Sequence, residues 1–349
     1  MDSRQRSISI LMLPWLAQGH ISPFMELAKS LTKGSFFIYF CSTPSPSIKF
    51  IDLHLSSSPD LPPHYHTTKD LTLHLMPTLK KAFDMAAPDF HQILKELNPD
   101  LVIYDFLQPW APAMALSLNI PTVHFLVTSA VMTAFLDHTG TNPGVEFFNP
   151  GIFIHDYRSS NIILIKSFRE LEGRYIDYLS FSLNKKMVSV GPLVQDPNEE
   201  ENFQEMKIIK WLDKREKNSA VFMEKIACGL ENSKVNFIWV VRFPNSEEKV
   251  KLEDELPEEF LDRISMERGM VVEGWAPRAR VLAHGAIRVF VSHCGWSSVM
   301  ESMQFGVPII AMPMHLDQPL NARLVEDVGV GIEVRERRTG GLRGERLRE

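Results

Sequence analysis

Cysteine is scarce in this chain. Its 349 residues include three cysteines, Cys41, Cys228 and Cys294, which are odd in number and widely spaced. This pattern does not support a disulfide framework, and it favours free thiols in a reducing compartment.

Long apolar runs are also absent. No stretch reaches the roughly 18 consecutive apolar residues of a membrane-spanning helix. Arg4 and Arg6 precede an apolar run at residues 8–17, as in a signal peptide, but Pro14 interrupts the run and no small-residue cleavage site follows. We therefore expect a cytoplasmic protein without a membrane span.

An excess of positive charge is missing as well. The chain has 37 Lys and Arg against 43 Asp and Glu, a net charge of −6. This balance gives no electrostatic reason to expect a nucleic acid as partner. A hydrophobic content of 44% is ordinary for a globular protein, and the length is enough for about two domains of roughly 150 residues each.

Signatures of other enzyme classes are missing too. A dinucleotide-dependent oxidoreductase needs G-x-G-x-x-G after its first strand, and residues 13–20 contain a single glycine. An α/β-hydrolase needs G-x-S-x-G, which we do not find. No cluster with metal-ligand spacing is apparent. His293-Cys294 could belong to a thiol nucleophile, but nothing in the sequence indicates a third, orienting group.

Short apolar runs alternate with helical patterns along the chain. Strands are predicted at residues 8–13, 35–41, 101–104, 122–127, 219–222, 237–241, 270–272, 289–291 and 309–312. An amphipathic helix is predicted after Pro23, and Gly19-His20 before it is predicted to lie in a loop. Such alternation indicates an α/β architecture with parallel sheets. The composition changes at residues 190–193, so we expect two Rossmann-like domains, residues 1–190 and 191–349, facing a cleft.

The densest chemical pattern lies between Trp275 and Gln318. A predicted strand ends in Ser292-His293-Cys294-Gly295, and a helix is predicted from Trp296 onward. Gly295 allows close backbone approach, and the hydroxyls of Ser297 and Ser298 lie beside the unpaired amides of the helix start. This arrangement is an anion site suited to a diphosphate. It lies at the carboxyl end of a strand, where open α/β sheets bind ligands.

Further residues of this segment suit a nucleotide sugar. Glu301 is within reach of a ribose diol, Trp275 offers a flat face to a base, and Asp317-Gln318 offers acceptors and donors to sugar hydroxyls. Each feature alone has an ordinary explanation. A Trp at a strand end often packs in the core, a Ser-Ser helix start is often an N-cap, and an Asp-Gln pair is often solvated surface. The combination carries the functional interpretation.

The segment from Trp275 to Gln318 resembles the C-terminal signature box of the plant secondary-product UDP-glycosyltransferases of family 1. The resemblance implies a GT-B fold with an acceptor-binding domain at residues 1–190 and a UDP-sugar-binding domain at residues 191–349. It assigns donor binding to Trp275, Ala276, Arg278, His293, Gly295, Trp296, Ser297, Ser298, Glu301, Asp317 and Gln318. In that assignment Trp275 stacks on uracil, Glu301 binds the ribose, and Asp317 with Gln318 binds the sugar. His293 and the start of the helix hold the diphosphate.

The same family carries a histidine in the pattern P-x-x-x-x-G-H, which residues 14–20 match at His20. A sugar hydroxyl is a poor nucleophile, and a histidine with an ordinary pKa near 6.5 suits the removal of its proton. Asp105, after the strand at residues 101–104, matches the family's orienting carboxylate. Alternatively, His20 is a loop histidine without a role and Asp105 is a helix N-cap. The resemblance implies inversion by a single displacement, with no metal and no cofactor because the UDP-sugar is a co-substrate. We expect a monomer whose partners are that donor and a small-molecule acceptor.

Four stretches resemble a branch of the family that attaches a sugar to a sugar already present on a plant glycoside. They are residues 60–68, 74–84 and 98–113 and the sequence ESMQFGVPIIAMPMHLDQP. The resemblance therefore implies a glycoside as acceptor. UDP-glucose is the expected donor, and Asp317-Gln318 is compatible with glucose and with other sugars.

The chain departs from the family pattern in several places. A Gly-Ser loop that touches the donor phosphates is missing after Phe222, where Met223-Glu224-Lys225 follows directly. The segment between residues 156 and 161 is short where the family has helices lining the acceptor pocket, and a charged tail at residues 335–349 replaces the final elements. Arg278 replaces the usual Gln, and Arg288 stands where a small residue is usual, at a cost if it is buried. These departures predict a mis-spliced or truncated product, so the alternative is an inactive paralogue that retains at most weak UDP or acceptor binding.

Overall fold

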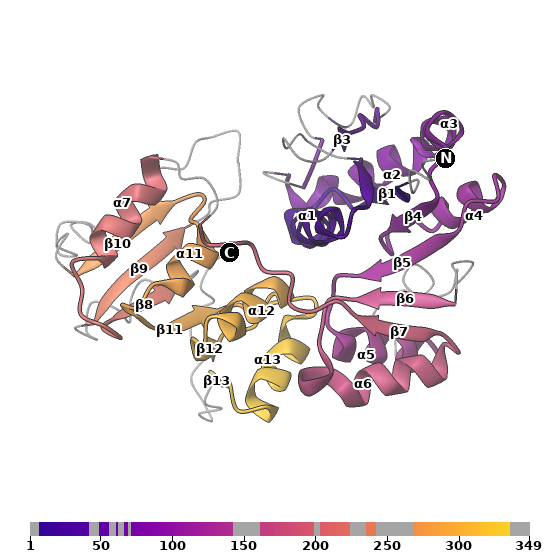
Figure 1. The fold of residues 1–349 in the computed structure, drawn as a ribbon. Helices are drawn as coiled ribbons and strands as arrows, with labels where there is room; N and C mark the ends of the chain where they lie inside the picture. The colour runs from indigo at the N-terminus through magenta and orange to yellow at the C-terminus, as the bar shows by residue number, and fades with distance from the viewer. Residues whose placement is uncertain are drawn as a thin grey trace, which may run out of the picture.

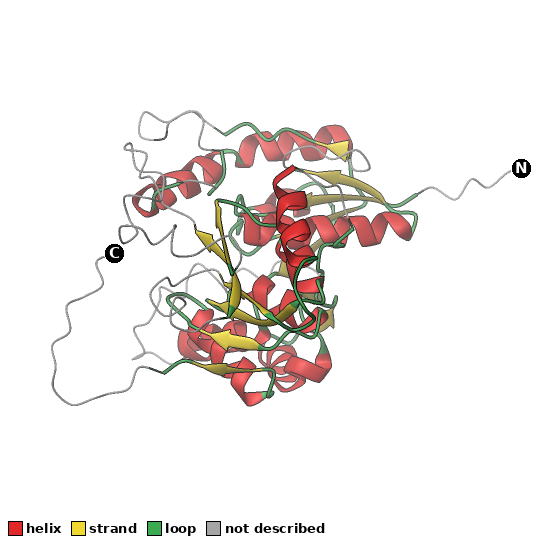
Figure 2. Cartoon of the chain, turned by 90° about the vertical axis from the view of Figure 1, so that its left-hand side faces the viewer, coloured by secondary structure: helices red, strands yellow, loops and turns green. Residues whose placement is uncertain are grey.

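Two parallel β-sheets with flanking helices make up the fold (Figures 1 and 2). The computed structural model describes residues 7–41, 49–55, 61, 66–68, 71–141, 161–198, 203–223, 235–241 and 268–335. Every strand pair is parallel. The predicted α/β architecture with two parallel sheets is confirmed.

The first sheet has the strand order β3-β2-β1-β4-β5-β6-β7. Its strands are β1 (Ser9–Leu13), β2 (Phe37–Phe40), β3 (Lys49–Phe50), β4 (Leu101–Tyr104), β5 (Thr122–Leu126), β6 (Ile162–Ile165) and β7 (Lys186–Ser189). The helices of this half are α1 (Gln18–Lys33), the 3₁₀ turn η1 (Leu73–Leu75), α2 (Met76–Met85), α3 (Ala87–Leu97), α4 (Ala111–Leu116), α5 (Ala130–Thr141) and α6 (Arg169–Ser182). The order reverses between β1 and β4, and open α/β sheets bind ligands at such a point.

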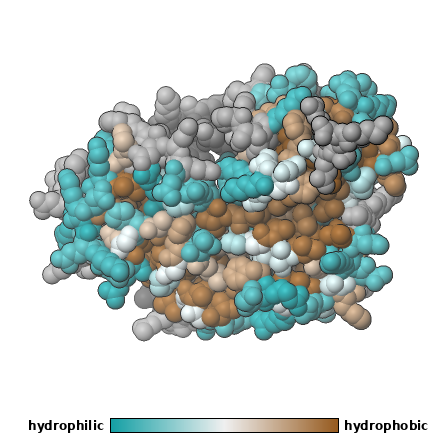
Figure 3. All heavy atoms as spheres, viewed as in Figure 1, coloured by the Kyte–Doolittle hydropathy of each residue, from teal (hydrophilic) through white to brown (hydrophobic). Residues whose placement is uncertain are grey.

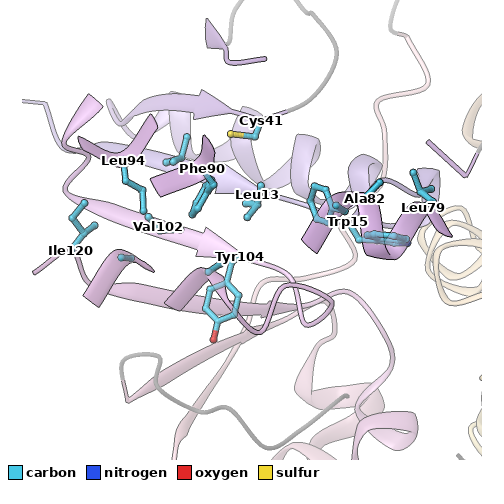
Figure 4. Packing of buried hydrophobic residues seen from close by; sticks show 14 of the residues in the cluster. Leu13, Trp15, Cys41, Leu79, Ala82, Phe90, Leu94, Val102, Tyr104 and Ile120 are labelled. Carbon is cyan, nitrogen blue, oxygen red and sulfur yellow. The ribbon is translucent and has the colours of Figure 1, made fainter. Parts of the chain in front are cut away.

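Strand β1 is buried on both of its faces, as an all-parallel sheet requires. Leu11 and Leu13 pack with α2, α3 and α4, whereas Ile10 and Met12 pack with α1. This division follows from the alternation of side chains along a strand. Figure 4 shows the first of these clusters, where Trp15 lies beside the helical residues of α2. The continuous apolar sequence of the strand is therefore explained by two separate layers of core.

The second sheet has the order β10-β9-β8-β11-β12-β13. Its strands are β8 (Ala220–Met223), β9 (Asn236–Val241), β10 (Gly269–Glu273), β11 (Ile287–Ser292), β12 (Ile309–Ala311) and β13 (Gly331–Glu333). The helices that the structure describes in this half are α7 (Phe203–Leu212), α11 (Arg278–Ala283), α12 (Trp296–Gln304) and α13 (Gln318–Asp327). Helices α7 and α11 pack on one cluster of sheet residues, and α12 and α13 pack on another. The order of this sheet reverses between β8 and β11.

The halves meet where α12 and α13 approach α5 and α6 (Figure 1). Val131 and Leu171 of the first half share a buried cluster with Trp296 of the second. The hydroxyl of Ser129 donates a hydrogen bond of 2.7 Å to Oδ1 of Asn321 across the same boundary. In the view of Figure 3, apolar side chains gather toward the middle of the face, over the first half.

The prediction that Gly19 and His20 lie in a loop is wrong. Helix α1 begins at Gln18, five residues before Pro23, which lies inside the helix. The amides of His20 and Ile21 donate to the carbonyl of Ala17 and close the first turn. Proline at the first helical position is a common helix start, but here a turn precedes it and carries His20 into the helix.

The other sequence predictions have different outcomes in the structure. Strands β3, β6, β7 and β13 were not predicted, because they are short or lie next to polar residues. Arg288 is exposed, so it carries no burial cost. Cys41 and Cys294 are buried thiols that form no disulfide, as expected, whereas Cys228 lies outside the described residues. Three predicted departures from the family pattern fall mostly outside the described residues. They are the loss of the Gly-Ser loop after Phe222, the short segment between residues 156 and 161, and the charged tail at residues 335–349.

Candidate active site

His20 and Asp105 form a hydrogen-bonded pair at the reversal point of the first sheet. His20 lies in the first turn of α1 after β1, and Asp105 follows β4 directly. The register pairs Leu13 with Tyr104, so both strands end at one level. Nδ1 of His20 is 2.7 Å from Oδ2 of Asp105, whose side chain is fully buried while that of His20 is 19% exposed. The ring is therefore held at Nδ1 and remains accessible.

Backbone amides fix the carboxylate of Asp105. The amide of Trp15 donates to Oδ2 at 3.1 Å, and the amide of Phe106 donates to Oδ1 at 2.8 Å. Asp105 is not the N-cap of α4, because that helix begins after Trp110. The carboxylate orients an imidazole, which is its role in hydrolase triads.

A second histidine lies next to this pair and was missed by the sequence analysis. His124 of β5 is buried and stacks on Tyr104, with ring centroids 5.1 Å apart. Burial lowers its pKa to about 4, and the negative charge of Asp105 opposes this only in part. His124 is therefore neutral near pH 7, and it leaves the charge of Asp105 available to His20.

The start of α12 presents unpaired backbone amides at the reversal point of the second sheet. The first bond of the helix runs from the amide of Val299 to the carbonyl of Gly295 at 3.1 Å, so the amides of residues 296–298 precede it. The N-cap is Gly295, which makes no side-chain cap, so Ser297 and Ser298 do not serve as the N-cap. A Cβ at Gly295 would lie 2.8 Å from Nε2 of His293, because the imidazole fills that space. Such a helix start is suited to bind an anion.

The turn before α12 is strained and firmly held. Cys294 has a φ of 64°, which costs free energy for a residue other than glycine. Its amide donates a hydrogen bond of 3.1 Å to Oγ of Ser292, and its carbonyl accepts a hydrogen bond of 3.0 Å from Nδ2 of Asn321. Cys294 is fully buried, which argues against a thiol nucleophile.

Trp275 and the pair Arg278–Glu301 lie on neighbouring elements of the second half. Trp275 follows β10 and is 46% exposed, so it does not pack in the core, whereas Ala276 is buried. Arg278 at the start of α11 donates two hydrogen bonds to Glu301 of α12, one from Nε and one of 3.0 Å from Nη2. The carboxylate that we expect to bind a ribose is already bound by a guanidinium.

Asp317 and Gln318 differ in how far their polar atoms are already committed to hydrogen bonds within the protein. Asp317 accepts a bond of 2.8 Å from Nδ2 of Asn321. Burial raises its pKa, and this is opposed by that bond and by the charges of His293 and His20. Oε1 of Gln318 accepts the amides of Met314 and His315, so its carbonyl braces its own loop. Asp317 shares an electrostatic environment with both histidines, whereas Gln318 is buried and committed to the loop.

Trp296 is placed differently from the diphosphate role that the resemblance gives it. Its indole is buried between the halves, and Nε1 donates 2.7 Å to the backbone carbonyl of Lys166. Its backbone amide is one of those that precede the first hydrogen bond of α12. Lys166, which the sequence analysis missed, directs Nζ to Oγ of Ser297 at 2.8 Å. Asn321 was missed as well, since it lies three residues past the signature segment.

The described residues offer neither a metal site nor a membrane span. The parts of the chain that the structure describes contain no group of three or more His, Cys, Asp or Glu side chains placed to hold a metal ion. Among the described helices, none is both long and apolar enough to span a bilayer.

Comparison with known proteins identifies the family. Residues 215–340 match the family model described as UDP-glucoronosyl and UDP-glucosyl transferase. A Panax ginseng protein named UDP-glucosyltransferase 29 is 49% identical over all of this chain and 88% of its own length. The chain belongs to the UDP-glycosyltransferase family. It therefore has the GT-B fold and descends from transferases that use a UDP-sugar.

Other matches of this UDP-glycosyltransferase extend the comparison. A Gardenia jasminoides protein named beta-D-glucosyl crocetin beta-1,6-glucosyltransferase is 45% identical over 94% of this chain and 86% of its own. An Arabidopsis thaliana protein crystallised with UDP-L-rhamnose has a TM-score of 0.80 at 25% identity, over 94% of this chain and 85% of its own. The alignment with the ginseng protein spans 396 positions against the 349 residues here, so that protein has segments without a counterpart in this chain.

Proposed function

We propose that this chain transfers a sugar from a UDP-sugar to a hydroxyl of a plant glycoside, with inversion at the anomeric carbon. The proposed sugar is glucose. In this proposal residues 1–190 bind the acceptor and residues 191–349 bind the donor. His20 takes the proton of the acceptor hydroxyl at Nε2 as that oxygen bonds to the anomeric carbon, and Asp105 stabilises the imidazolium. UDP leaves as the bond from the anomeric carbon to its phosphate oxygen breaks. Its charge is held by the amides of α12 and by His293.

The observation that carries the proposal is the pair of His20 and Asp105, whose Nδ1 and Oδ2 atoms lie 2.7 Å apart where β1 and β4 end. The proposed donor site is linked to this pair through Asp317, whose pKa is lowered by His293 of the second half and, to a smaller extent, by His20 of the first, against the larger effect of burial. We therefore propose that the base, the sugar-binding carboxylate and the diphosphate site face one space. The donor-binding roles of Trp275, Ala276, Gly295, Ser298 and Gln318 are proposed from the family resemblance.

The relatives support the choice of acceptor and donor. The Gardenia protein is named for adding glucose to a glucosyl group, and the ginseng protein is named as a glucosyltransferase. The Arabidopsis structure contains UDP-L-rhamnose. We therefore propose glucose first and keep rhamnose as a donor to be assayed.

The test is UDP release from purified protein supplied with UDP-glucose and a panel of glycosides and their aglycones. We expect turnover with glycosides, and we expect His20→Ala to lower kcat by about 10²- to 10⁴-fold while the Kd for UDP stays the same. The matched control is His284→Ala, since His284 also pairs with an aspartate, Asp213, at 3.2 Å. It should retain most of the turnover.

Two results would contradict the proposal. Equal turnover of wild type and His20→Ala would remove His20 as the base. UDP binding without turnover of any donor would favour the inactive paralogue, which the comparisons do not support.

A further inference from the structure

Lys166 is a buried cation at the boundary between the halves. It directly follows β6, at the carboxyl edge of the first sheet, and is 2% exposed. Its carbonyl accepts the indole N–H of Trp296 at 2.7 Å, and Nζ donates to Oγ of Ser297 at 2.8 Å. The lysine therefore extends from the first half to the first turn of α12 in the second.

The charged groups around Nζ do not neutralise it directly. Glu301 of α12 and Glu26 of α1 favour its charged form, and Arg278 of α11 disfavours it. Glu301 is bound by Arg278, and Glu26 by Lys29 at 2.8 Å. Within the described part of the chain, no carboxylate lies within ion-pair distance of Lys166.

This position is unfavourable for a lysine in the absence of a ligand. The N-terminus of a helix carries partial positive charge, which attracts anions and repels cations. Burial lowers the pKa of Lys166 to about 7, so its charge is only partly retained near neutral pH. A buried cation of this kind is explained if an anion binds beside it.

We propose that Lys166 binds the diphosphate of the UDP-sugar, reaching the donor from the acceptor half. This inference rests on the proposed function. The diphosphate would lie between the amides of α12 and Nζ of Lys166, with Ser297 between them as a shared hydroxyl. Donor binding would thereby also strengthen the contact between the two halves.

The experiment compares a ligand that has the diphosphate with one that lacks it. Lys166→Met keeps most of the length of the side chain and removes its charge. By calorimetry we expect the variant to bind UDP-glucose about tenfold to hundredfold more weakly, and uridine within about twofold of wild type. Lys186→Met is the matched control. Lys186 is exposed and is the first residue of β7, so it lies at the edge of the sheet opposite to Lys166. This variant should bind both ligands as wild type does.

Proton uptake gives a readout that a structural role would not produce. A bound anion raises the pKa of Lys166. Binding of UDP-glucose above about pH 7 should therefore be accompanied by proton uptake, and the affinity for UDP-glucose should fall as the pH rises. The diphosphate of UDP-glucose has no terminal phosphate that titrates in this range, unlike that of UDP. Lys166→Met should lower this uptake. Its thermal stability without ligand should equal or exceed that of wild type, because a buried charge has been removed.

The outcomes separate this inference from the proposed function. Failure of wild type to bind UDP-glucose would overturn both. Equal weakening of uridine and UDP-glucose by Lys166→Met, or unchanged binding of both, would overturn the role of Lys166 alone. Loss of thermal stability with unchanged proton uptake would assign Lys166 to the interface only.

Discussion

The carboxylate of Glu301 illustrates how one residue can change a binding site. Its two oxygens accept hydrogen bonds from Arg278, and both side chains are largely buried, at 13% and 20% exposure. Bidentate, charge-assisted bonds of this kind are among the strong ones. A ribose diol must therefore share Glu301 with a guanidinium.

Arg278→Gln should release Glu301 toward the ribose. We expect uridine to bind about three- to tenfold more tightly, a gain of roughly 1 kcal/mol, because the carboxylate no longer serves the guanidinium. Calorimetry with uridine measures this without the diphosphate. Glu301→Gln is the companion variant and should weaken uridine binding; weaker uridine binding by Arg278→Gln would instead mean that Arg278 contacts the nucleoside.

At the scale of elements, α5 is capped by a residue of another helix. The amides of Ala130 and Val131 donate to Glu172 of α6 at 3.0 and 2.8 Å, and Oγ of Ser167 donates at 2.6 Å. Glu172 is fully buried and has a non-helical conformation, which kinks α6. A carboxylate at a helix N-terminus satisfies the free amides and the helix dipole.

Burial raises the pKa of Glu172 despite these bonds. The folded state therefore holds the proton of Glu172 to higher pH than the unfolded state does. Its contribution to stability is present at low pH and is lost as pH rises through the folded pKa, above the ordinary carboxyl range. The unfolding free energy of wild type minus that of Glu172→Gln should accordingly fall as the pH rises above the ordinary carboxyl range of about pH 4.

Denaturant unfolding at several pH values measures this difference. Glu170→Gln is the control, since Glu170 is exposed in the same helix. A rising difference would show that the hydrogen bonds outweigh burial at Glu172.

Elements were predictable from sequence to different degrees, for physical reasons. Strands β1, β4 and β5 were found because they are buried on both faces and their sequences are mostly apolar. Strand β7, with the sequence KMVS, is at the sheet edge and lacks such a run. The first turn of α1 was missed because Pro23 suggested a later start, although the pairing of His20 with Asp105 depends on this turn.

At the scale of the whole molecule, the same topology places both parts of the site. Each sheet reverses its strand order once, with His20 and Asp105 at one reversal and the start of α12 at the other. The sequence pointed to these residues because each belongs to a contiguous motif or directly follows a recognisable strand. Contacts between the halves, such as Lys166 with Ser297, join residues 131 positions apart and leave no local pattern to detect.

Asn321 connects three parts of this assembly through one amide group. It is fully buried, donates to the carbonyl of Cys294 and to Asp317, and accepts from Ser129 of the first half. The strained turn before α12, the carboxylate proposed to bind sugar and the domain contact all depend on it. A buried amide with every partner satisfied is costly to remove.

Asn321→Ala should lower both stability and donor affinity. We expect a loss of about 2–4 kcal/mol in unfolding free energy and about tenfold weaker UDP binding, because the turn that positions the amides of α12 loses its support. Ser129→Ala removes the bond between the halves and the contact of Ser129 with the amide of Met132, but leaves both bonds within the second half intact. It should therefore lower stability by about 1 kcal/mol and leave UDP affinity unchanged. Chemical denaturation and calorimetry on the two variants separate these effects: equal losses of UDP affinity would mean that the donor site depends on the domain contact and not on the turn that Asn321 holds.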